Sequence, residues 1–227
     1  MPQDPASILV DVVCRLAEPA ARTWFLESMA DPGDGSPQTR IGVALAGAGR
    51  RLGGKRHDLA AEDLAVLALS GLVGVESWPL ERCARVALVA RGIEDIAVAE
   101  HRAFVDELFR TGDNAEREAL LGCLCALPGP ERFQETAVEA CRTNVVPVFE
   151  AVACENLYPE RFFPESAFNQ MVIKAIFLEV AVRRIEGIER RANAELARMA
   201  TDYASERSAA GRVVPDDIDL VTGFATR

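Results

Sequence analysis

The chain has 227 residues, of which 49% are hydrophobic, 26% are charged and only 6% are aromatic. Asp and Glu outnumber Lys and Arg by 35 to 25, which gives a formal net charge of -10. This acidic excess argues against a polyanion as the main ligand, because contacts to phosphates supply most of the non-specific affinity for nucleic acid. We therefore expect a globular protein that binds no nucleic acid.

The sequence also lacks the patterns of export, membrane insertion and metal binding. No run of about 18 uncharged apolar residues occurs, and no basic stretch precedes an apolar core near the first residues. The six cysteines have neither a CxxC pair nor histidines at zinc-finger spacing. Buried free thiols in a reducing compartment are the simplest interpretation. We therefore expect a cytoplasmic protein with no metal, no cofactor and no direct membrane insertion.

The expected elements are all helices. Residues 6–30 have a helical pattern with a break at Glu18-Pro19, and a turn-rich link follows over residues 31–37. Ser36 before Pro37 predicts a helix cap with proline in the first turn. Further helix starts are expected near residues 40, 60, 79, 95, 114 and 131.

These starts follow one another at roughly 16 to 20 residues, so two helices give a period of about 35 to 40, as in helix-pair solenoids. The predicted fold is all-α, with antiparallel helix pairs over 6–144 stacked as a HEAT-like α-solenoid array and no significant β-sheet. A compact irregular α bundle is the alternative. We expect a single all-α domain over 1–227, in which residues 145–227 form apolar central helices and C-terminal helices.

Two candidates lie in the first two thirds of the chain. The basic cluster Arg50, Arg51, Lys55, Arg56 and His57 follows a helix end, where it offsets the helix dipole, although it could also dock acidic lipid headgroups or a partner. His101 lies on the same predicted apolar stripe as Phe104, which makes it either a satisfied core histidine or a residue that lines a groove.

Glu150 and Lys174 are single charges in otherwise apolar helices. An unpaired buried charge would shift its pKa and become neutral, so each needs a partner. We expect Glu150 or Glu155 to lie within ion-pair distance of Lys174. Such a pair is either a structural link between helices or a polar spot in a ligand groove, and Lys174 could instead reach the surface.

A second group of polar residues lies close together in this part of the sequence. Cys154, Glu155, Asn156 and Tyr158 precede or adjoin a proline, where they form either a ligand or partner surface or a structural corner. A nucleophilic role for Cys154 would require a nearby base. Asn169 and Gln170 lie in an apolar helix, where amides need partners from another helix or from a ligand.

These residues belong to a longer pattern that resembles one known family. The pattern comprises Thr143-Asn144, Val148-Phe149-Glu150-Ala151, Ala153-Cys154-Glu155-Asn156, Tyr158-Pro159, Phe163-Pro164-Glu165, Phe168-Asn169-Gln170-Met171-Val172, Lys174-Ala175, Arg191, Asn193, Glu195-Leu196-Ala197-Arg198-Met199, Tyr203-Ala204 and Glu206-Arg207. It resembles the EboA family of bacterial proteins, densely over residues 141–212 and more loosely back to the first helix. Leu157 departs from the family pattern, which has proline there.

The resemblance implies an all-α, HEAT-like protein encoded beside a membrane prenyltransferase and metabolic enzymes, in gene clusters that make or move small molecules. It brings no established catalytic residue. The leading hypothesis is a non-catalytic helical adaptor or small-molecule carrier in a bacterial secondary-metabolite biosynthesis and transport pathway. Its expected partners are other proteins of the same gene cluster, with the membrane prenyltransferase as one candidate, and a small apolar metabolite.

Two other functions have the right size and shape. One is an enzyme or ligand-transferring accessory protein that acts on an isoprenoid-like or polyol substrate, with Glu150, Lys174 and the corner at residues 154–158 as its site. The other is a HEAT-like DNA-repair protein, against which the net charge of -10 argues.

Overall fold

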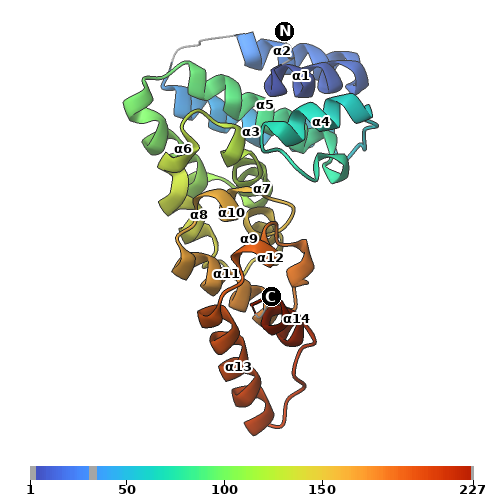
Figure 1. Ribbon diagram of the computed structural model, residues 1–227. Coiled ribbons are helices and arrows are strands. Elements are labelled where there is room, and N and C mark those ends of the chain that lie inside the picture. The colour runs from blue at the N-terminus through green and yellow to red at the C-terminus, as the bar shows by residue number, and fades with distance from the viewer. Residues whose placement is uncertain (1–3, 31–34, 226–227) are drawn as a thin grey trace. The chain divides into compact units, whose positions relative to one another are not determined.

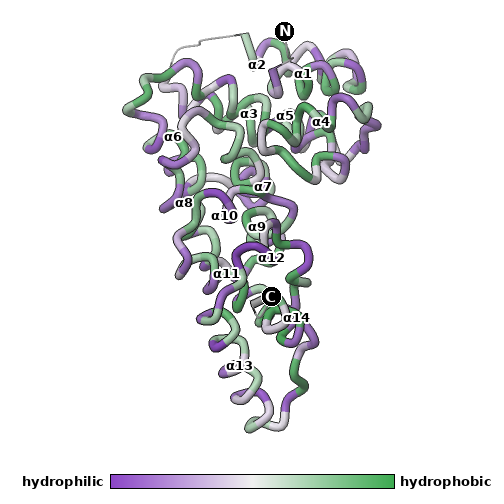
Figure 2. Tube along the Cα trace, viewed as in Figure 1, coloured by the Kyte–Doolittle hydropathy of each residue, from purple (hydrophilic) through white to green (hydrophobic). Residues whose placement is uncertain are grey.

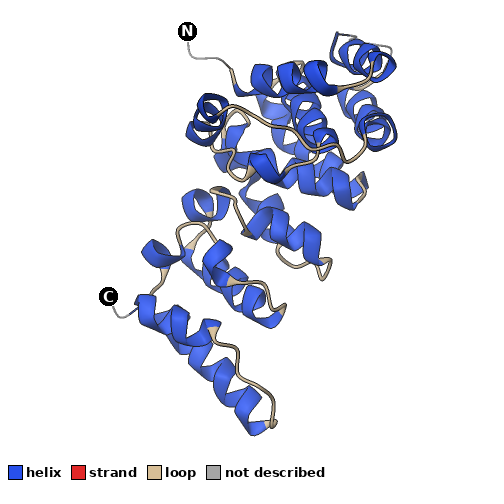
Figure 3. Ribbon diagram, turned by 90° about the vertical axis from the view of Figure 1, so that its right-hand side faces the viewer, coloured by secondary structure: helices blue, strands red, loops and turns tan. Residues whose placement is uncertain are grey.

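The computed structural model describes residues 4–30 and 35–225, and within these ranges it contains fourteen α-helices, five short 3-10 helices and no strand (Figures 1 and 3). The all-α class is therefore confirmed. The link expected at 31–37 falls partly outside the described residues. The chain divides into two compact units, Met1–Ala137 (unit 1) and Val138–Arg227 (unit 2). The expectation of one domain over 1–227 stays a prediction.

Unit 1 contains seven complete α-helices and four 3-10 helices. They are α1 (Pro5–Leu16), α2 (Pro19–Ala30), α3 (Pro37–Leu52), α4 (Ala61–Leu69), η1 (Val75–Ser77), α5 (Leu80–Glu94), η2 (Val98–Glu100), α6 (His101–Thr111), α7 (Asn114–Cys123), η3 (Leu124–Ala126) and η4 (Pro130–Phe133). The eighth helix, α8 (Gln134–Ala140), begins in unit 1 and ends in unit 2.

Local sequence signals explain most of these boundaries. The break before Pro19 separates α1 from α2 as predicted. Ser36 caps α3, because its Oγ accepts a hydrogen bond from the Thr39 N–H at 3.2 Å. The helix start expected near residue 95 is wrong. Ala97 is extended and exposed between α5 and η2, so α6 begins only at His101.

The central helix of unit 1 is α5, which packs against α1, α3 and α7. Its buried charge, Arg85, is satisfied by Glu81 Oε2 at 2.8 Å and by the Leu45 carbonyl of α3 at 3.2 Å. A Cβ atom at Gly92 would lie 2.5 Å from Ile41 Cγ1, so glycine permits the close approach of α5 to α3. The hydropathy colouring in Figure 2 shows apolar and polar residues alternating along the helices of this unit.

Both tryptophans of the chain lie in unit 1, each beneath an arginine. The Arg51 guanidinium stands 5.0 Å from the Trp24 ring centroid, and that of Arg82 stands 4.4 Å from the Trp78 ring centroid. At these distances the positive charge of each arginine is attracted to the face of the indole ring.

Unit 2 is built around α9 and α11. Its elements are α9 (Val146–Ala153), α10 (Tyr158–Phe162), α11 (Glu165–Phe177), η5 (Val182–Arg184), α12 (Ile188–Arg191), α13 (Ala194–Ala209) and α14 (Asp217–Ala225). Helix α9 contacts α10, α11 contacts η5 and α13, and α14 contacts α12 and α13. The aromatic side chains Phe149 of α9, Tyr158 of α10 and Phe168 of α11 are fully buried.

The end of α11 has an unusual residue in a common motif. The Val180 N–H donates to the Ala175 carbonyl at 2.9 Å and the Glu179 N–H donates to the Ile176 carbonyl at 3.2 Å, which is the Schellman pattern. This pattern needs a left-handed residue after the helix, a position that usually holds glycine. Here Glu179 occupies it with φ 58°.

The stacking of helices 40–144 as antiparallel pairs stays a prediction. Contacts in unit 1 include pairs far apart in sequence, such as α1 with α5, as well as near neighbours such as α6 with α7. None of the helices in the described ranges combines the length and apolar character needed to cross a membrane.

Candidate functional site

The predicted polar corner of unit 2 is organised by an arginine. Glu150 of α9 and Glu155, just after it, both bind Arg184 of η5. Arg184 Nη1 donates to Glu150 Oε1 at 2.5 Å, and its Nε and Nη2 donate to the two Glu155 oxygens at 3.0 and 2.9 Å. Hydrogen bonds to Glu155, and then to Glu150, raise the pKa of Arg184. The three side chains form an ion-pair cluster of one cation and two carboxylates, which joins η5 to the end of α9.

The predicted contact between Lys174 and a carboxylate is wrong. In the described part of the chain, Lys174 makes no ion pair, because the forked guanidinium of Arg184 takes both Glu150 and Glu155. The Lys174 ammonium instead lies 5.9 Å from the Phe149 ring centroid. Its side chain is half-buried, and burial lowers the pKa of Lys174.

The remaining corner residues hold the backbone in place. Asn156 is buried, and its Nδ2 donates to the Ala151 carbonyl at 2.8 Å while its Oδ1 accepts from the Tyr158 N–H at 2.9 Å. Glu155 adopts a left-handed conformation with φ 43°, so its N–H reaches the Arg184 carbonyl at 2.9 Å. Burial raises the pKa of the Cys154 thiol to about 12, which opposes a thiolate nucleophile near neutral pH.

The two predicted amides of α11 have different surroundings. Asn169 is buried and exchanges two hydrogen bonds of 3.1 Å with Asn193, whose Oδ1 also caps α13 by accepting from the Leu196 N–H. Gln170 is exposed to solvent, so the expectation that both amides need a partner from another helix or a ligand does not hold for this residue. Successive residues of an α-helix are rotated by about 100° about its axis, so Asn169 and Gln170 lie on different faces of α11.

Sequence reasoning missed the role of Arg191, which it noted only as part of the family pattern. Arg191 donates to the carbonyls of Pro159, Glu160 and Phe163 at 3.1, 2.6 and 2.9 Å, and its guanidinium lies 4.5 Å from the Phe168 ring centroid. Carbonyls at a helix end lack partners within the helix, so Arg191 satisfies the end of α10. No local signal distinguishes this arginine from its neighbour Arg190.

His101 belongs to unit 1, whereas the other eight predicted residues belong to unit 2. It is the first residue of α6 and is only 4% exposed, in agreement with its predicted place on the apolar stripe. Its Nδ1 atom has no hydrogen-bond partner among the described residues.

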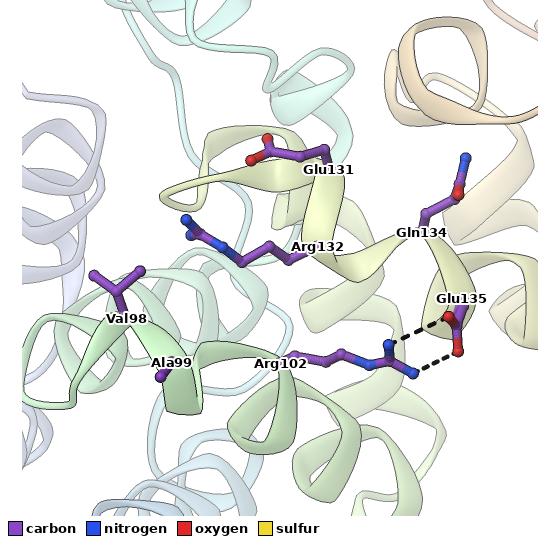
Figure 4. Close-up of a pocket in the computed structure, with 7 residues that line it drawn as sticks. All are labelled: Val98, Ala99, Arg102, Glu131, Arg132, Gln134 and Glu135. Carbon is purple, nitrogen blue, oxygen red and sulfur yellow. Dashed lines mark hydrogen bonds and ion pairs between the residues drawn. The ribbon is translucent and has the colours of Figure 1, made fainter.

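A hollow in unit 1 offers the space for a ligand. It has a volume of about 620 Å³ and is open to solvent. Ligand sites commonly have volumes of about 300 to 1,000 Å³. Its walls come from η2, the first turn of α6, η4 and the first turn of α8, which contribute Val98, Ala99, Arg102, Glu131, Arg132, Gln134 and Glu135 (Figure 4). We call this feature the η2–η4 hollow.

Two of its charged side chains satisfy one another. Arg102 donates through Nη1 and Nη2 to the two carboxylate oxygens of Glu135, as the dashed lines in Figure 4 show, and it also lies 3.5 Å from Asp106. These hydrogen bonds, above all those to Glu135, raise the pKa of Arg102. In this bidentate pair the two charges neutralise one another at the wall of the hollow.

Arg132 lines the same hollow without an ion pair in the described ranges. It follows the Pro128-Gly129-Pro130 turn, in which Gly129 has φ 63°, a conformation that glycine adopts without steric cost. Its Nη1 donates to the Pro128 carbonyl at 3.3 Å, a long hydrogen bond that uses one of the five guanidinium N–H groups. Val98, 57% exposed, adds an apolar surface to the same wall.

A second hollow of about 520 Å³ lies between α3, α6 and the start of α7. Its acidic side chains already have partners in the chain. Asp113 and Glu116 form a reciprocal capping box at the start of α7, and Glu107 binds Arg110 at 2.8 Å. The η2–η4 hollow is therefore the better candidate for a ligand.

Nothing in the sequence indicates the η2–η4 hollow. Arg102 has the spacing of a polar helix face, and the Pro128-Gly129-Pro130 turn before Arg132 by itself indicates only a break between two helices. Within the described ranges, no group of three His, Cys, Asp or Glu side chains is placed to hold a metal ion.

Comparison with known proteins extends the resemblance noted in the sequence. No curated protein and no solved structure matches the chain. The model of one protein family, described as metabolite traffic protein EboA, matches residues 6–222, which is nearly the whole chain. The chain therefore belongs to the EboA family.

Proposed function

We propose that this protein is a non-catalytic small-molecule carrier in a bacterial secondary-metabolite pathway of the cytoplasm, and that it holds its cargo in the η2–η4 hollow. The observation that carries the proposal is the hollow itself, which has a volume of about 620 Å³. It combines an exposed apolar side chain, Val98, with an arginine, Arg132, that makes no ion pair with any residue the structure describes. Membership in a family described as metabolite traffic proteins supports it.

The walls of the hollow suit a carrier. The Arg102–Glu135 pair links the first turn of α6 to the first turn of α8, so this part of the wall is formed before a ligand arrives. A preformed site avoids the entropy cost of ordering side chains on binding. Its openness to solvent allows a ligand to be taken up and handed on, with η2 and η4 as the two edges.

The alternative, an enzyme with its site at the corner of unit 2, has less support. Glu150 and Glu155 are held by Arg184, and both amide groups of the Asn169–Asn193 pair are engaged. These side chains stabilise the fold of unit 2 through bonds that a substrate would have to break. The resemblance also implies partner proteins, among them a membrane prenyltransferase. In the proposed function the protein acts as an adaptor as well, because the carrier with its bound ligand would contact these partners.

The test is to identify small molecules retained by the purified protein, using mass spectrometry of a denatured extract. Ala99→Trp places a large side chain in the η2–η4 hollow, and we expect it to abolish the retained compound. Ala46→Trp does the same in the second hollow, and Ala209→Trp is a matched change at an exposed position of α13. We expect both to keep the compound.

The outcomes separate the possibilities. A compound retained equally by the wild-type protein and by Ala99→Trp would contradict a site in the η2–η4 hollow. Loss in Ala46→Trp alone would move the site to the second hollow. Circular dichroism of each variant checks that the helices are intact.

A further inference from the structure

The geometry points to a specific class of cargo: a small anion, bearing a phosphate or carboxylate and at least one hydroxyl or ammonium group, that binds between Arg132 and Glu131. This inference rests on the proposed carrier function and names the ligand class of the same hollow. It differs from the small apolar metabolite that the sequence suggested.

The first step concerns which charges are available. Of the four charged residues that line the hollow, Arg102 and Glu135 are joined by two hydrogen bonds. Arg132 and Glu131 make no ion pair within the described ranges, and both are exposed. Figure 4 shows the Arg132 guanidinium joined to none of the other residues drawn, and its Nη1 lies against the Pro128-Gly129 turn that precedes η4. The hollow therefore presents one cation and one anion to a ligand.

The second step concerns the geometry that a guanidinium prefers. Its planar fork binds two oxygens of a carboxylate or phosphate at once, which gives direction as well as charge neutralisation. Arg132 donates one N–H to the Pro128 carbonyl, and its guanidinium has four further N–H groups that can donate to a ligand. That one hydrogen bond orients the guanidinium, and the remaining donors suit an incoming oxyanion.

The third step concerns Glu131. A carboxylate only accepts hydrogen bonds, so it repels the anionic group of a ligand and binds hydroxyl or ammonium groups. The ligand therefore needs a donor on the side opposite its acid group. Val98 and Ala99 of η2 line the remaining wall and suit the carbon skeleton between the two ends.

Glycerol 3-phosphate is a suitable probe, because it combines a phosphate with two hydroxyl groups. Its binding to the full-length protein is measured by saturation-transfer NMR and titration, with inorganic phosphate and glycerol as the two halves of the probe. We expect glycerol 3-phosphate to bind more tightly than either half. Arg132→Gln should weaken this binding at least about tenfold, since hydrogen bonds to charged groups are among the strongest in proteins.

Two further variants complete the design. Arg212→Gln removes an exposed arginine of unit 2 and should leave the affinity unchanged within about twofold. Glu131→Ala should reduce the preference for glycerol 3-phosphate over inorganic phosphate. Equal binding by Arg132→Gln and wild type would overturn the inference, and an unchanged preference in Glu131→Ala would overturn the role of Glu131.

A phosphate could also come from a lipid headgroup. Vesicles that contain phosphatidylglycerol distinguish the two sources, and binding to vesicles without binding of the soluble probe would overturn the assignment to a small metabolite. The failure of this inference differs from failure of the carrier function. A retained compound that Ala99→Trp loses and Arg132→Gln keeps would support a carrier with a different class of cargo.

Discussion

Four cysteines, Cys83, Cys123, Cys141 and Cys154, are buried, and burial raises the pKa of each thiol from 9.0 to about 12. Below pH 9 the thiols are protonated in both the folded and the unfolded chain, so this contribution to stability is fully present. Between pH 9 and 12 the unfolded chain releases protons that the folded chain keeps, which favours unfolding.

We therefore expect the free energy of unfolding to fall above pH 9, by up to about 1.4 kcal/mol per pH unit for each buried thiol. Urea unfolding at several pH values, followed by circular dichroism, measures the slope. Other groups also ionise in this range, so the comparison is with Cys154→Ala, which should show a shallower slope. Identical slopes for the two proteins would contradict a buried, protonated Cys154.

Asn193 serves two helices at once, because it caps α13 and exchanges hydrogen bonds with the buried Asn169. Asn193→Ala should destabilise unit 2 by about 2 to 3 kcal/mol, since it removes a cap worth about 1 kcal/mol and leaves a buried amide unpaired. The midpoint of urea unfolding measures the change. Asn144→Ala, at an exposed position of the same unit, should alter it by less than about 0.5 kcal/mol. Equal midpoints for the two variants would refute the dual role.

The single residues that could be predicted are those whose partners lie nearby in the chain. Ser36 and Asn193 cap helices through the N–H three residues ahead, so the sequence alone indicates the bond. The partner of Glu150 lies 34 residues away, and several cations could reach it. The preference for Arg184 over Lys174 depends on backbone positions that only the folded unit defines.

At the scale of elements, the end of α11 carries conformational strain. A left-handed conformation costs a residue with a side chain roughly 1 to 2 kcal/mol relative to glycine. We expect Glu179→Gly to stabilise unit 2 by about 1 kcal/mol, because Glu179 is exposed and has φ 58°. Glu206→Gly makes the same change inside α13 and should destabilise it by about 1 kcal/mol. Thermal unfolding distinguishes the two signs, and a loss of stability in both variants would argue against strain at Glu179.

Helix positions in this chain follow mostly from local chemistry. Prolines and caps predicted the starts of α2, α3 and α7, and the apolar pattern predicted a mainly buried α9. The start of α6 was misplaced, because apolar residues at 96–98 continue the helical pattern, whereas the backbone is extended at Ala97 and then forms η2. The η2–η4 hollow was missed for a related reason. Its walls are four short stretches, and no periodicity relates them.

At the scale of the whole molecule, the net charge of -10 opposes contact with anionic surfaces. The basic cluster at residues 50–57 could still attract an anionic surface, but two of its residues already have partners within the chain. Lys55 binds Glu18 at 2.9 Å, and Arg51 lies over Trp24. Each basic residue near an anionic membrane contributes about 1 kcal/mol, and salt screens such contacts within about 8 Å.

We therefore expect no flotation of the protein with phosphatidylglycerol vesicles at physiological salt, and at most weak flotation at low salt. A variant with Arg50, Arg51 and Arg56 replaced by Gln is the control, and it should behave as the wild-type protein does at physiological salt. Strong flotation of the wild type, lost in this variant, would instead identify the cluster as a membrane-docking surface.

The two units differ in the fluorescent side chains that they contain. Both tryptophans, Trp24 and Trp78, belong to unit 1, and both tyrosines, Tyr158 and Tyr203, belong to unit 2. Light at the long-wavelength edge of protein absorption excites tryptophan alone, so the emission it produces originates in the unit that contains the η2–η4 hollow. The chain thus carries a natural fluorophore in the same unit as the η2–η4 hollow, so the proposed binding of a ligand can be tested by its emission without attaching a label.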